Sequence, residues 1–207
     1  IKILTIIDDS YFGLFYEDAV YPRSIFSSLA AIHPNILSIK LDGSTKEDFA
    51  WGFRVGFLTY GGKGFTKEQY AALEQKTKGV IRSTISNSNK LGQSLLIRAL
   101  KSETYEQEKA ENIKVLRAKY QKVKEICNRS GKNSLLKPLP FNSGYFMCFR
   151  LEKGSTEKLR QYLLYEKGIG TISINDRYLR IAYAFVEQEN LEELYEELFN
   201  AAEVVAG

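Results

Sequence analysis

The stretch Lys40–Phe57 reads KLDGSTKEDFAWGFRVGF and carries Lys46 and Arg54, eight residues apart, among glycine and aromatic residues. Lys46 comes just after a predicted strand, and Gly43 lets the backbone turn tightly between the two. A lysine held against apolar neighbours loses solvation, which favours its neutral amine, and a neutral amine can attack a carbonyl to form a Schiff base. A solvated surface lysine is the alternative interpretation.

Arg54 stands where the next strand, over Arg54–Tyr60, is predicted to begin. A planar guanidinium binds phosphate through two parallel hydrogen bonds, so this position suits a phosphate group. A surface ion pair is the alternative for Arg54.

Two more strands are predicted before this stretch. Ile1–Ile7, IKILTII, is a continuous apolar run of the kind found in buried parallel strands, and Ile36–Leu41 is a second. The intervening segment Ser24–Ile32 has the pattern of a helix, so together they predict a βαβ crossover.

Asp8 and Tyr11 follow the first predicted strand directly, in IIDDSYFGL. Ligands of open α/β sheets bind outside the carboxyl ends of the strands, where a carboxylate can pair with a cation on the ligand. The alternative is that Asp8 and Asp9 only cap the turn that follows.

The second half of the chain changes from long helices to short strands. Helices are predicted from a Thr66 cap to Thr84, over Lys90–Leu100 and over Ser102–Asn128, with Gly131 as the C-cap of the last. An α+β unit follows, and we place the boundary between two domains, 1–100 and 101–207, near Lys101. Its predicted elements are the strands Tyr145–Leu151, Thr171–Ile174 and Tyr178–Ala184 and the helices Thr156–Glu166 and Asn190–Ala202.

Arg180 lies inside the apolar strand of YLRIAYA, where a charge needs a partner. The carboxylate of a substrate would serve, and a structural salt bridge is the alternative.

Composition narrows the function classes. A net charge of +4 with 29 Lys+Arg against 25 Asp+Glu argues against a nucleic-acid partner, and the apolar runs are too short to span a bilayer. We see no signal peptide, and the chain does not begin with Met. The cysteines, Cys127 and Cys148, form no CxxC pair, so we expect a reducing cytoplasm. His33 is the one histidine, which argues against a metal site, and none is predicted.

The order and spacing of these residues resemble the aminotransferase class I/II family of fold-type I pyridoxal-phosphate (PLP) enzymes. The matching residues are Asp8 and Tyr11 in DDSY, Lys46 and Arg54 in TKEDFAWGFR, and Arg180 in YLRIAYA. Asn142–Phe146, NSGYF, is similar to a strand of the family's small domain. The resemblance implies an α/β fold: the C-terminal part of the PLP-binding large domain, with three strands of a mainly parallel sheet, followed by a small α+β domain.

The resemblance also implies a role for each residue. Lys46 would hold PLP as a Schiff base and move the Cα proton of the substrate. Asp8 would pair with the pyridine nitrogen, Tyr11 with the phenolic oxygen and Arg54 with the phosphate. Arg180 would bind the α-carboxylate of an amino acid. The expected reaction is transfer of an amino group between an amino acid and a 2-oxo acid in a homodimer.

This sequence departs from the family at two points. Gly43 stands where many members have a serine three residues before the lysine, so that Ser44, Thr45 or no hydroxyl replaces that phosphate contact. The family's N-terminal half has no counterpart here, so we expect this chain to be inactive alone and to self-associate through its first strand. A PLP-dependent lyase and a non-catalytic effector-binding domain of a regulator are the alternative functions.

Overall fold

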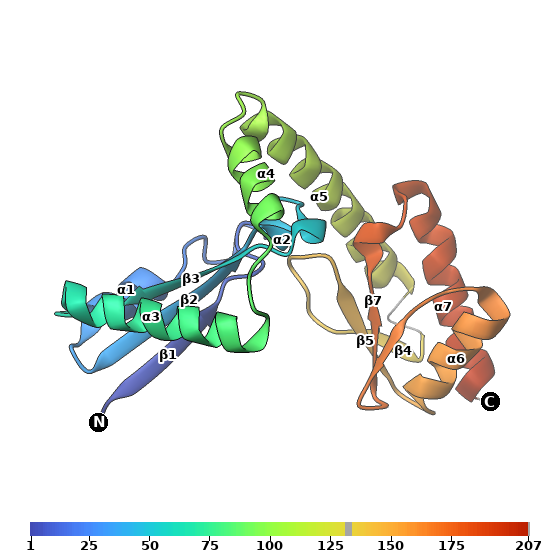
Figure 1. Cartoon of the computed structure of the whole chain (residues 1–207). Helices are drawn as coiled ribbons and strands as arrows, with labels where there is room; N and C mark the ends of the chain where they lie inside the picture. Colours follow the sequence, from blue (N-terminus) through green and yellow to red (C-terminus); the bar gives the residue numbers. More distant parts are fainter. Residues whose placement is uncertain (131–133, 207) are drawn as a thin grey trace. The chain divides into compact units, whose positions relative to one another are not determined.

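In the computed structural model, which describes residues 1–130 and 134–206, the chain begins with a three-stranded sheet in the order β1–β2–β3 (Figure 1). β1 and β2 run parallel, with Asp8 opposite Leu41, and α1 (Phe26–Ile32) connects them, which confirms the predicted βαβ unit. β3 runs antiparallel to β2. The strands are β1 (Ile3–Asp8), β2 (Ile36–Gly43) and β3 (Gly56–Gly61).

Helices cover this sheet on opposite faces. Gly61 faces α1 so closely that a Cβ there would lie 2.8 Å from atoms of Phe26 and Ala30. The neighbouring Tyr60 points the other way, and its hydroxyl shares a 2.5 Å hydrogen bond with Thr77 of α3 (Lys67–Thr84). Successive side chains of a strand point to opposite faces, so α1 and α3 lie on different sides of the sheet (Figure 1).

The helices after β3 begin at the caps that their sequences favour. The side chains of Thr66 and Gln69 form a reciprocal capping box at the start of α3, as the threonine predicted. Asn89 accepts a hydrogen bond from the Gly92 amide and so caps α4, which spans the predicted Lys90–Leu100. The long helix α5 spans Tyr105–Ser130, and Gly131, its predicted C-cap, lies outside the described residues.

The rest of the chain forms a second, wholly antiparallel sheet in the order β4–β5–β7–β6. The three-residue strand β4 was not predicted from the sequence. The predicted strand over Tyr178–Ala184 ends at Ile181, and a 3₁₀ turn at Tyr183–Phe185 follows. The elements are β4 (Leu136–Pro138), β5 (Met147–Leu151), α6 (Thr156–Lys167), β6 (Ile172–Ile174), β7 (Tyr178–Ile181), a 3₁₀ turn at Gln188–Asn190 and α7 (Leu191–Ala206).

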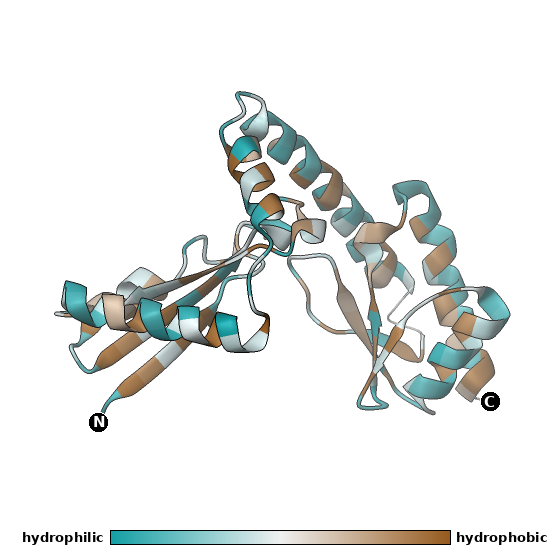
Figure 2. Ribbon diagram, viewed as in Figure 1, coloured by the Kyte–Doolittle hydropathy of each residue, from teal (hydrophilic) through white to brown (hydrophobic). Residues whose placement is uncertain are grey.

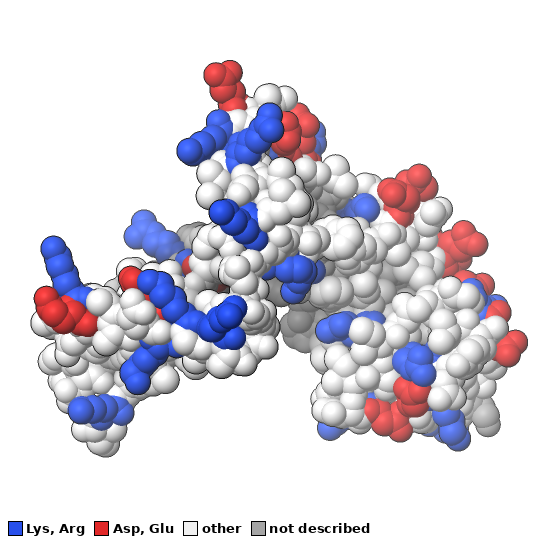
Figure 3. Space-filling view, in the orientation of Figure 1, with Lys and Arg blue, Asp and Glu red and all other residues white. Residues whose placement is uncertain are grey.

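The core of this second part lies between its sheet and its helices. The ring of Phe149 in β5 packs edge-on against Tyr195 and Phe199 of α7, and it is fully buried. Leu159 and Leu163 of α6 are buried as completely. Figure 3 shows charged side chains of both signs scattered over one face of the protein, with uncharged areas between them.

Two compact units result. The first comprises Ile1–Phe15 and Ala19–Lys109, and the second comprises Tyr16–Asp18 and Ala110–Gly207. The architecture confirms the predicted fold class, an α/β part followed by an α+β part. Across the described residues, no helix combines the length and the apolar character that crossing a membrane requires.

Apolar side chains remain exposed on the first unit. Leu4 and Ile6 of β1 are 58% and 63% exposed, and Figure 2 shows this strand as largely hydrophobic. β1 pairs with β2 along one edge only, and it is the outer strand of the sheet. Edge strands of this kind are prone to pair with other chains.

Candidate active site

Four of the five predicted site residues gather at one edge of the first sheet. The parallel strands β1 and β2 both end there, and β3, which runs the other way, begins there, with Gly43 opposite Gly56. Asp8 ends β1, Lys46 follows β2 by three residues, and Arg54 precedes β3 by two. The sheet topology therefore places segments from three separate parts of the sequence side by side.

Lys46 lies in α2 (Ser44–Glu47), a helix of only one turn. Its Nζ atom is 5.7 Å from the centre of the Tyr11 ring, which comes from the loop after β1. An ammonium at that distance from a phenol ring is attracted by the electrons of the ring face. The structure thus brings together the predicted Schiff-base lysine and the predicted phenol.

Asp8 forms the turn that leads to Tyr11. Its Oδ1 accepts hydrogen bonds from the Ser10 amide at 3.1 Å and from the Ser10 hydroxyl. These bonds hold the pKa of the Asp8 carboxyl below its ordinary value, because they stabilise the ionised form. Asp8 therefore caps the turn that follows β1, as the alternative interpretation expected. Its carboxylate is also exposed at the edge of the sheet.

The neighbouring Asp9 is held differently. It forms an ion pair with Lys40 of β2 at 3.6 Å, and the same Lys40 pairs with Asp42 at 2.7 Å. Its amide also donates to the Leu41 carbonyl, which extends the pairing of β1 and β2 beyond Asp8. Asp9 thus fixes the backbone from which the Tyr11 loop departs.

The sequence pattern predicted a strand that begins at Arg54, and this prediction was wrong. Arg54 lies in a left-handed turn with φ of 53°, before β3 begins at Gly56. A 3₁₀ turn at Trp51–Phe53 precedes it, and the Nη1 atom of Arg54 donates to the Trp51 carbonyl at 3.2 Å. The turn exposes the guanidinium at the site edge. A second non-glycine residue of this loop, Phe49, also has a left-handed backbone, with φ of 55°.

The loop between Lys46 and Arg54, which contains the two left-handed residues, is held by contacts with the start of α4. The Asn89 side-chain amide donates to the Phe53 carbonyl at 3.1 Å while it caps α4. Gly92 lies so near that a Cβ on it would come within 2.8 Å of the Phe53 oxygen. Left-handed non-glycine residues cost about 1–3 kcal/mol each, and such contacts hold them in place.

Ser44 is one of the two residues whose hydroxyl could replace the serine that contacts the phosphate in the family. Its side chain is fully buried, and its Oγ donates to the Val55 carbonyl at 3.3 Å. This hydroxyl therefore braces the turn between β2 and α2 internally. Thr45, the other alternative, is partly exposed.

Arg180, the fifth predicted residue, belongs to the second unit. It lies in β7 between Cys148 of β5 and Ile172 of β6, and its guanidinium carbon is 4.8 Å from the centre of the Phe146 ring. Within residues 1–130 and 134–206 no carboxylate forms an ion pair with it, so the structural salt bridge of the alternative interpretation is not found. Its charge is half-buried and faces an aromatic ring.

The contacts that hold the end of α2, directly after Lys46, were not predicted from the sequence. Glu47 and Asp48, which follow the lysine, form hydrogen bonds and ion pairs with Lys109 at 3.2 and 3.3 Å. Tyr105 donates to Asp48 at 2.5 Å. The acidic pair was visible in the sequence beside Lys46, but no local signal points to partners about sixty residues away.

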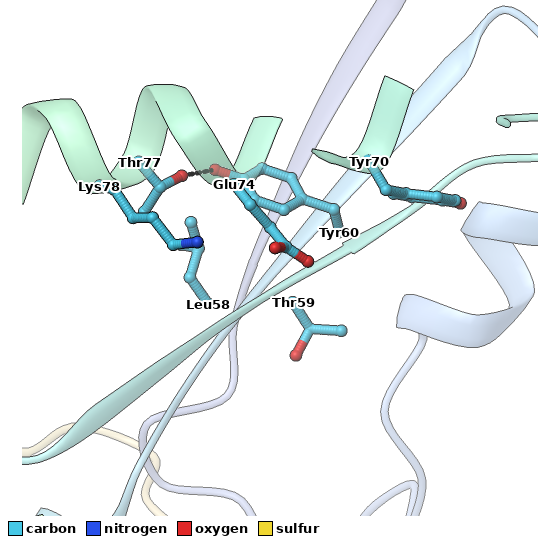
Figure 4. Close-up of a pocket in the computed structure, with 7 residues that line it drawn as sticks. All are labelled: Leu58, Thr59, Tyr60, Tyr70, Glu74, Thr77 and Lys78. Atoms are coloured by element: carbon cyan, nitrogen blue, oxygen red, sulfur yellow. Dashed lines mark hydrogen bonds between the residues drawn. The ribbon is translucent and has the colours of Figure 1, made fainter. Parts of the chain in front are cut away.

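A groove elsewhere in the first unit contains none of the predicted residues. It lies between β3 and α3, holds about 570 Å³ and is lined by Leu58, Thr59, Tyr60, Tyr70, Glu74, Thr77 and Lys78. Figure 4 shows Leu58 and Tyr60 pointing toward α3, while Thr59 points away from it. The groove follows the later part of β3, whereas Arg54 precedes the start of that strand.

Several solved structures of similar fold are aminotransferases of about twice this length. An aminotransferase from Anaerococcus prevotii matches 100% of this chain and 48% of its own, with 21% identity and a TM-score of 0.78. The α-aminoadipate aminotransferase of Thermus thermophilus, complexed with N-(5'-phosphopyridoxyl)-L-leucine, matches 98% of this chain and 51% of its own, at 24% identity and a TM-score of 0.74. The kynurenine aminotransferase of Pyrococcus horikoshii matches 97% and 48%, at 18% identity and a TM-score of 0.75.

The chain therefore spans about half the length of the solved structures that it matches. Among curated protein sequences, none matches it significantly. The sequence profile described as aminotransferase class I and II matches residues 1–198, nearly the whole chain. This protein thus belongs to the aminotransferase class I and II family.

Proposed function

We propose that this chain carries the lysine-bearing part of the active site of a PLP-dependent aminotransferase, which transfers an amino group between an amino acid and a 2-oxo acid. The observation that supports this best is the convergence of Lys46, Tyr11, Asp8 and Arg54 on one sheet edge. When bound, PLP supplies an electron sink for carbanions formed at the substrate Cα.

The side chains at the edge suit the chemical groups of that cofactor. Lys46 offers an amine for the aldehyde carbon, and Tyr11 a phenol for the phenolic oxygen. Asp8, held ionised by Ser10, offers an anion for the protonated pyridine nitrogen. Arg54 offers an exposed guanidinium for the phosphate. The donor set therefore fits PLP group by group.

Each of these residues would have a different role in the reaction. Lys46 would hold the cofactor through its Nζ amine, and the same amine would carry the proton to and from the substrate Cα. Asp8 would pair with the ring nitrogen and favour its protonated form. Arg180 binds the α-carboxylate of the substrate, since its guanidinium has no carboxylate partner among the described residues.

The length of the relatives leads to a second part of the proposal. Since this chain corresponds to about half of each of these aminotransferases, we propose that turnover and tight PLP binding need a longer polypeptide that supplies the remaining half. We expect that polypeptide to work as a homodimer in the cytoplasm, a location with which the free thiols of Cys127 and Cys148 agree.

The test is an assay of the chain and of the complete polypeptide with PLP, a panel of amino acids and a 2-oxo acid acceptor. We expect the complete polypeptide to form a new amino acid from the acceptor and a 2-oxo acid from the donor, and the chain alone to be inactive. Release of ammonia and a cleaved fragment without amino transfer would instead indicate a lyase. Binding of amino acids without any product would indicate an effector-binding domain.

A further inference from the structure

The helix that presents Lys46 cannot hold itself in place. α2 comprises only four residues, and isolated helices of that length are not stable. Phe49, two residues beyond it, has a left-handed backbone, which is unfavourable for a residue other than glycine. The orientation of α2 must therefore come from contacts with other elements.

The beginning of α2 is anchored to the sheet. Ser44 follows Gly43, the last residue of β2, and its buried hydroxyl donates to the Val55 carbonyl. The carbonyl of Ser44 accepts from the amides of Asp48 and Ala50 at 3.3 and 3.1 Å, which closes the turn. These contacts fix the backbone before Lys46, but they act on one end of α2 only.

The end of α2 is held by side chains from the first turn of α5. Lys109 Nζ lies 3.2 Å from Glu47 Oε1 and 3.3 Å from Asp48 Oδ1, and Tyr105 Oη donates to the same Asp48 oxygen at 2.5 Å. The Tyr105 hydroxyl in turn lies 3.3 Å from Lys109 Nζ, so the four groups form a closed network. All of them belong to the first unit.

This network is partly withdrawn from water. The side chains of Lys109 and Asp48 are 21% and 13% exposed. Burial by itself would lower the pKa of Lys109, but the hydrogen bond to Tyr105 and the charge of Glu47 outweigh it and raise that pKa, so the ammonium stays charged. Charged hydrogen bonds sheltered in this way are stronger than those of a surface ion pair.

Glu47 also faces the loop that carries Tyr11. A Cβ placed on Gly13 of that loop would lie 3.8 Å from Glu47 Oε1, the same oxygen that Lys109 binds. The network thus lies beside both of the segments whose side chains, Lys46 and Tyr11, meet at 5.7 Å.

We propose that Lys109, assisted by Tyr105, is a positioning residue for Lys46: it holds Glu47 and Asp48, fixes α2, and so aims the amine at the site edge. The inference rests on the proposed function for the role of Lys46. A purely structural role, in which the network only attaches α5 to the first unit, is the alternative that the experiment must distinguish.

The test compares Lys109→Met, Lys109→Arg and Tyr105→Phe in the complete polypeptide. Lys122→Met is the matched control, because Lys122 lies on the same helix and forms a similar half-exposed ion pair, with Glu192 at 2.7 Å. The first measurement is the rate at which added PLP becomes fixed to Lys46 on borohydride reduction, compared with the rate at other lysines by peptide mass spectrometry. The second, without PLP, is amide hydrogen exchange of residues 44–50.

We expect Lys109→Met to slow fixation at Lys46 by roughly ten- to a hundredfold, since small misplacements of a reacting group have effects of this size. Exchange of the 44–50 amides should accelerate by about tenfold, and Lys109→Arg should restore much of both. Tyr105→Phe keeps the ion pairs, so it should fold and change both readouts in the same direction by about threefold. Lys122→Met should change neither.

Unaltered fixation at Lys46 and unaltered exchange in a folded Lys109→Met or Tyr105→Phe protein would overturn the positioning role. If the unsubstituted protein never fixes PLP at Lys46, the proposed function fails instead. In that case the exchange of residues 44–50 still decides whether Lys109 orders α2.

Discussion

Lys46 and Tyr11 meet across the edge of the first sheet, with the lysine Nζ 5.7 Å from the centre of the phenol ring. They come from the ends of β2 and β1, which run parallel, so the order of the strands brings them together. A lysine that must hold an aldehyde and a phenol that must touch the adjoining ring oxygen need this proximity. The pair is thus the strongest local support for the proposed reaction.

The substitution Tyr11→Phe removes the phenol hydroxyl and keeps the ring, so it tests these two parts of the side chain separately. The Lys46–ring contact stays, so PLP should still become fixed to Lys46, but loss of the hydroxyl should shift the absorbance of the bound cofactor and lower kcat by about ten- to a hundredfold. Absorbance titration and steady-state kinetics of the complete polypeptide test this. Tyr21→Phe, an exposed tyrosine of the same unit, is the control, and equal effects of the two substitutions would contradict the role of Tyr11.

Ser10→Ala should raise the pKa of Asp8. The hydroxyl and amide of Ser10 hold that pKa below 3.8 in the folded protein, so the folded state gains stability from Asp8 above the unfolded pKa and loses it as the pH falls through the folded one. The variant should therefore be less stable than the parent at neutral pH, with the difference vanishing in acid. Carboxyl NMR titration gives the pKa directly, and an unchanged value would show that Ser10 does not control Asp8.

The two thiols should differ in reactivity. Burial raises the pKa of Cys127 to about 12, against a weaker opposing effect of Lys124, and it raises the pKa of the half-buried Cys148 despite the nearby Arg180. Because the thiolate is the reactive form, both should react slowly with a disulfide reagent at pH 8, and Cys127 more slowly than Cys148. Peptide mapping after timed labelling measures the order, and faster labelling of Cys127 in the folded protein would be inconsistent with the structure.

The exposed β1 edge should make this chain self-associate. Ile6→Lys places a charge on the edge strand and should lower the association constant by at least about tenfold, because charged edge strands resist pairing. Sedimentation velocity over a concentration series measures it. Val80→Lys, at an equally exposed apolar position of α3, should have little effect, and a monomeric parent at high concentration would refute the prediction.

Local patterns predicted most of the elements. α4 covers the predicted Lys90–Leu100, and the Thr66 cap starts α3, because a polar cap before a helical repeat acts within a few residues. β4 was missed because three residues that include Pro138 carry no strand pattern. It forms through pairing with β5, which is a tertiary contact.

The candidate site was predictable only in part, for the same reason. Asp8, Tyr11 and Lys46 follow strands, and the topology of parallel strands then brings them to one edge. The left-handed turn at Arg54 depends on its contact with the Trp51 carbonyl and on the clamp from Asn89. The partnership of Lys109 with Glu47 joins distant segments, and no spacing rule expresses it.

Borohydride reduction of the complete polypeptide with PLP, followed by peptide mass spectrometry, locates the lysine to which the cofactor becomes fixed. The expected result is a phosphopyridoxyl group on Lys46 and loss of that modification in Lys46→Arg, with the other lysines little modified. A folded protein in which PLP is fixed elsewhere, or nowhere, would contradict it and would leave the aminotransferase fold without the lysine chemistry proposed here.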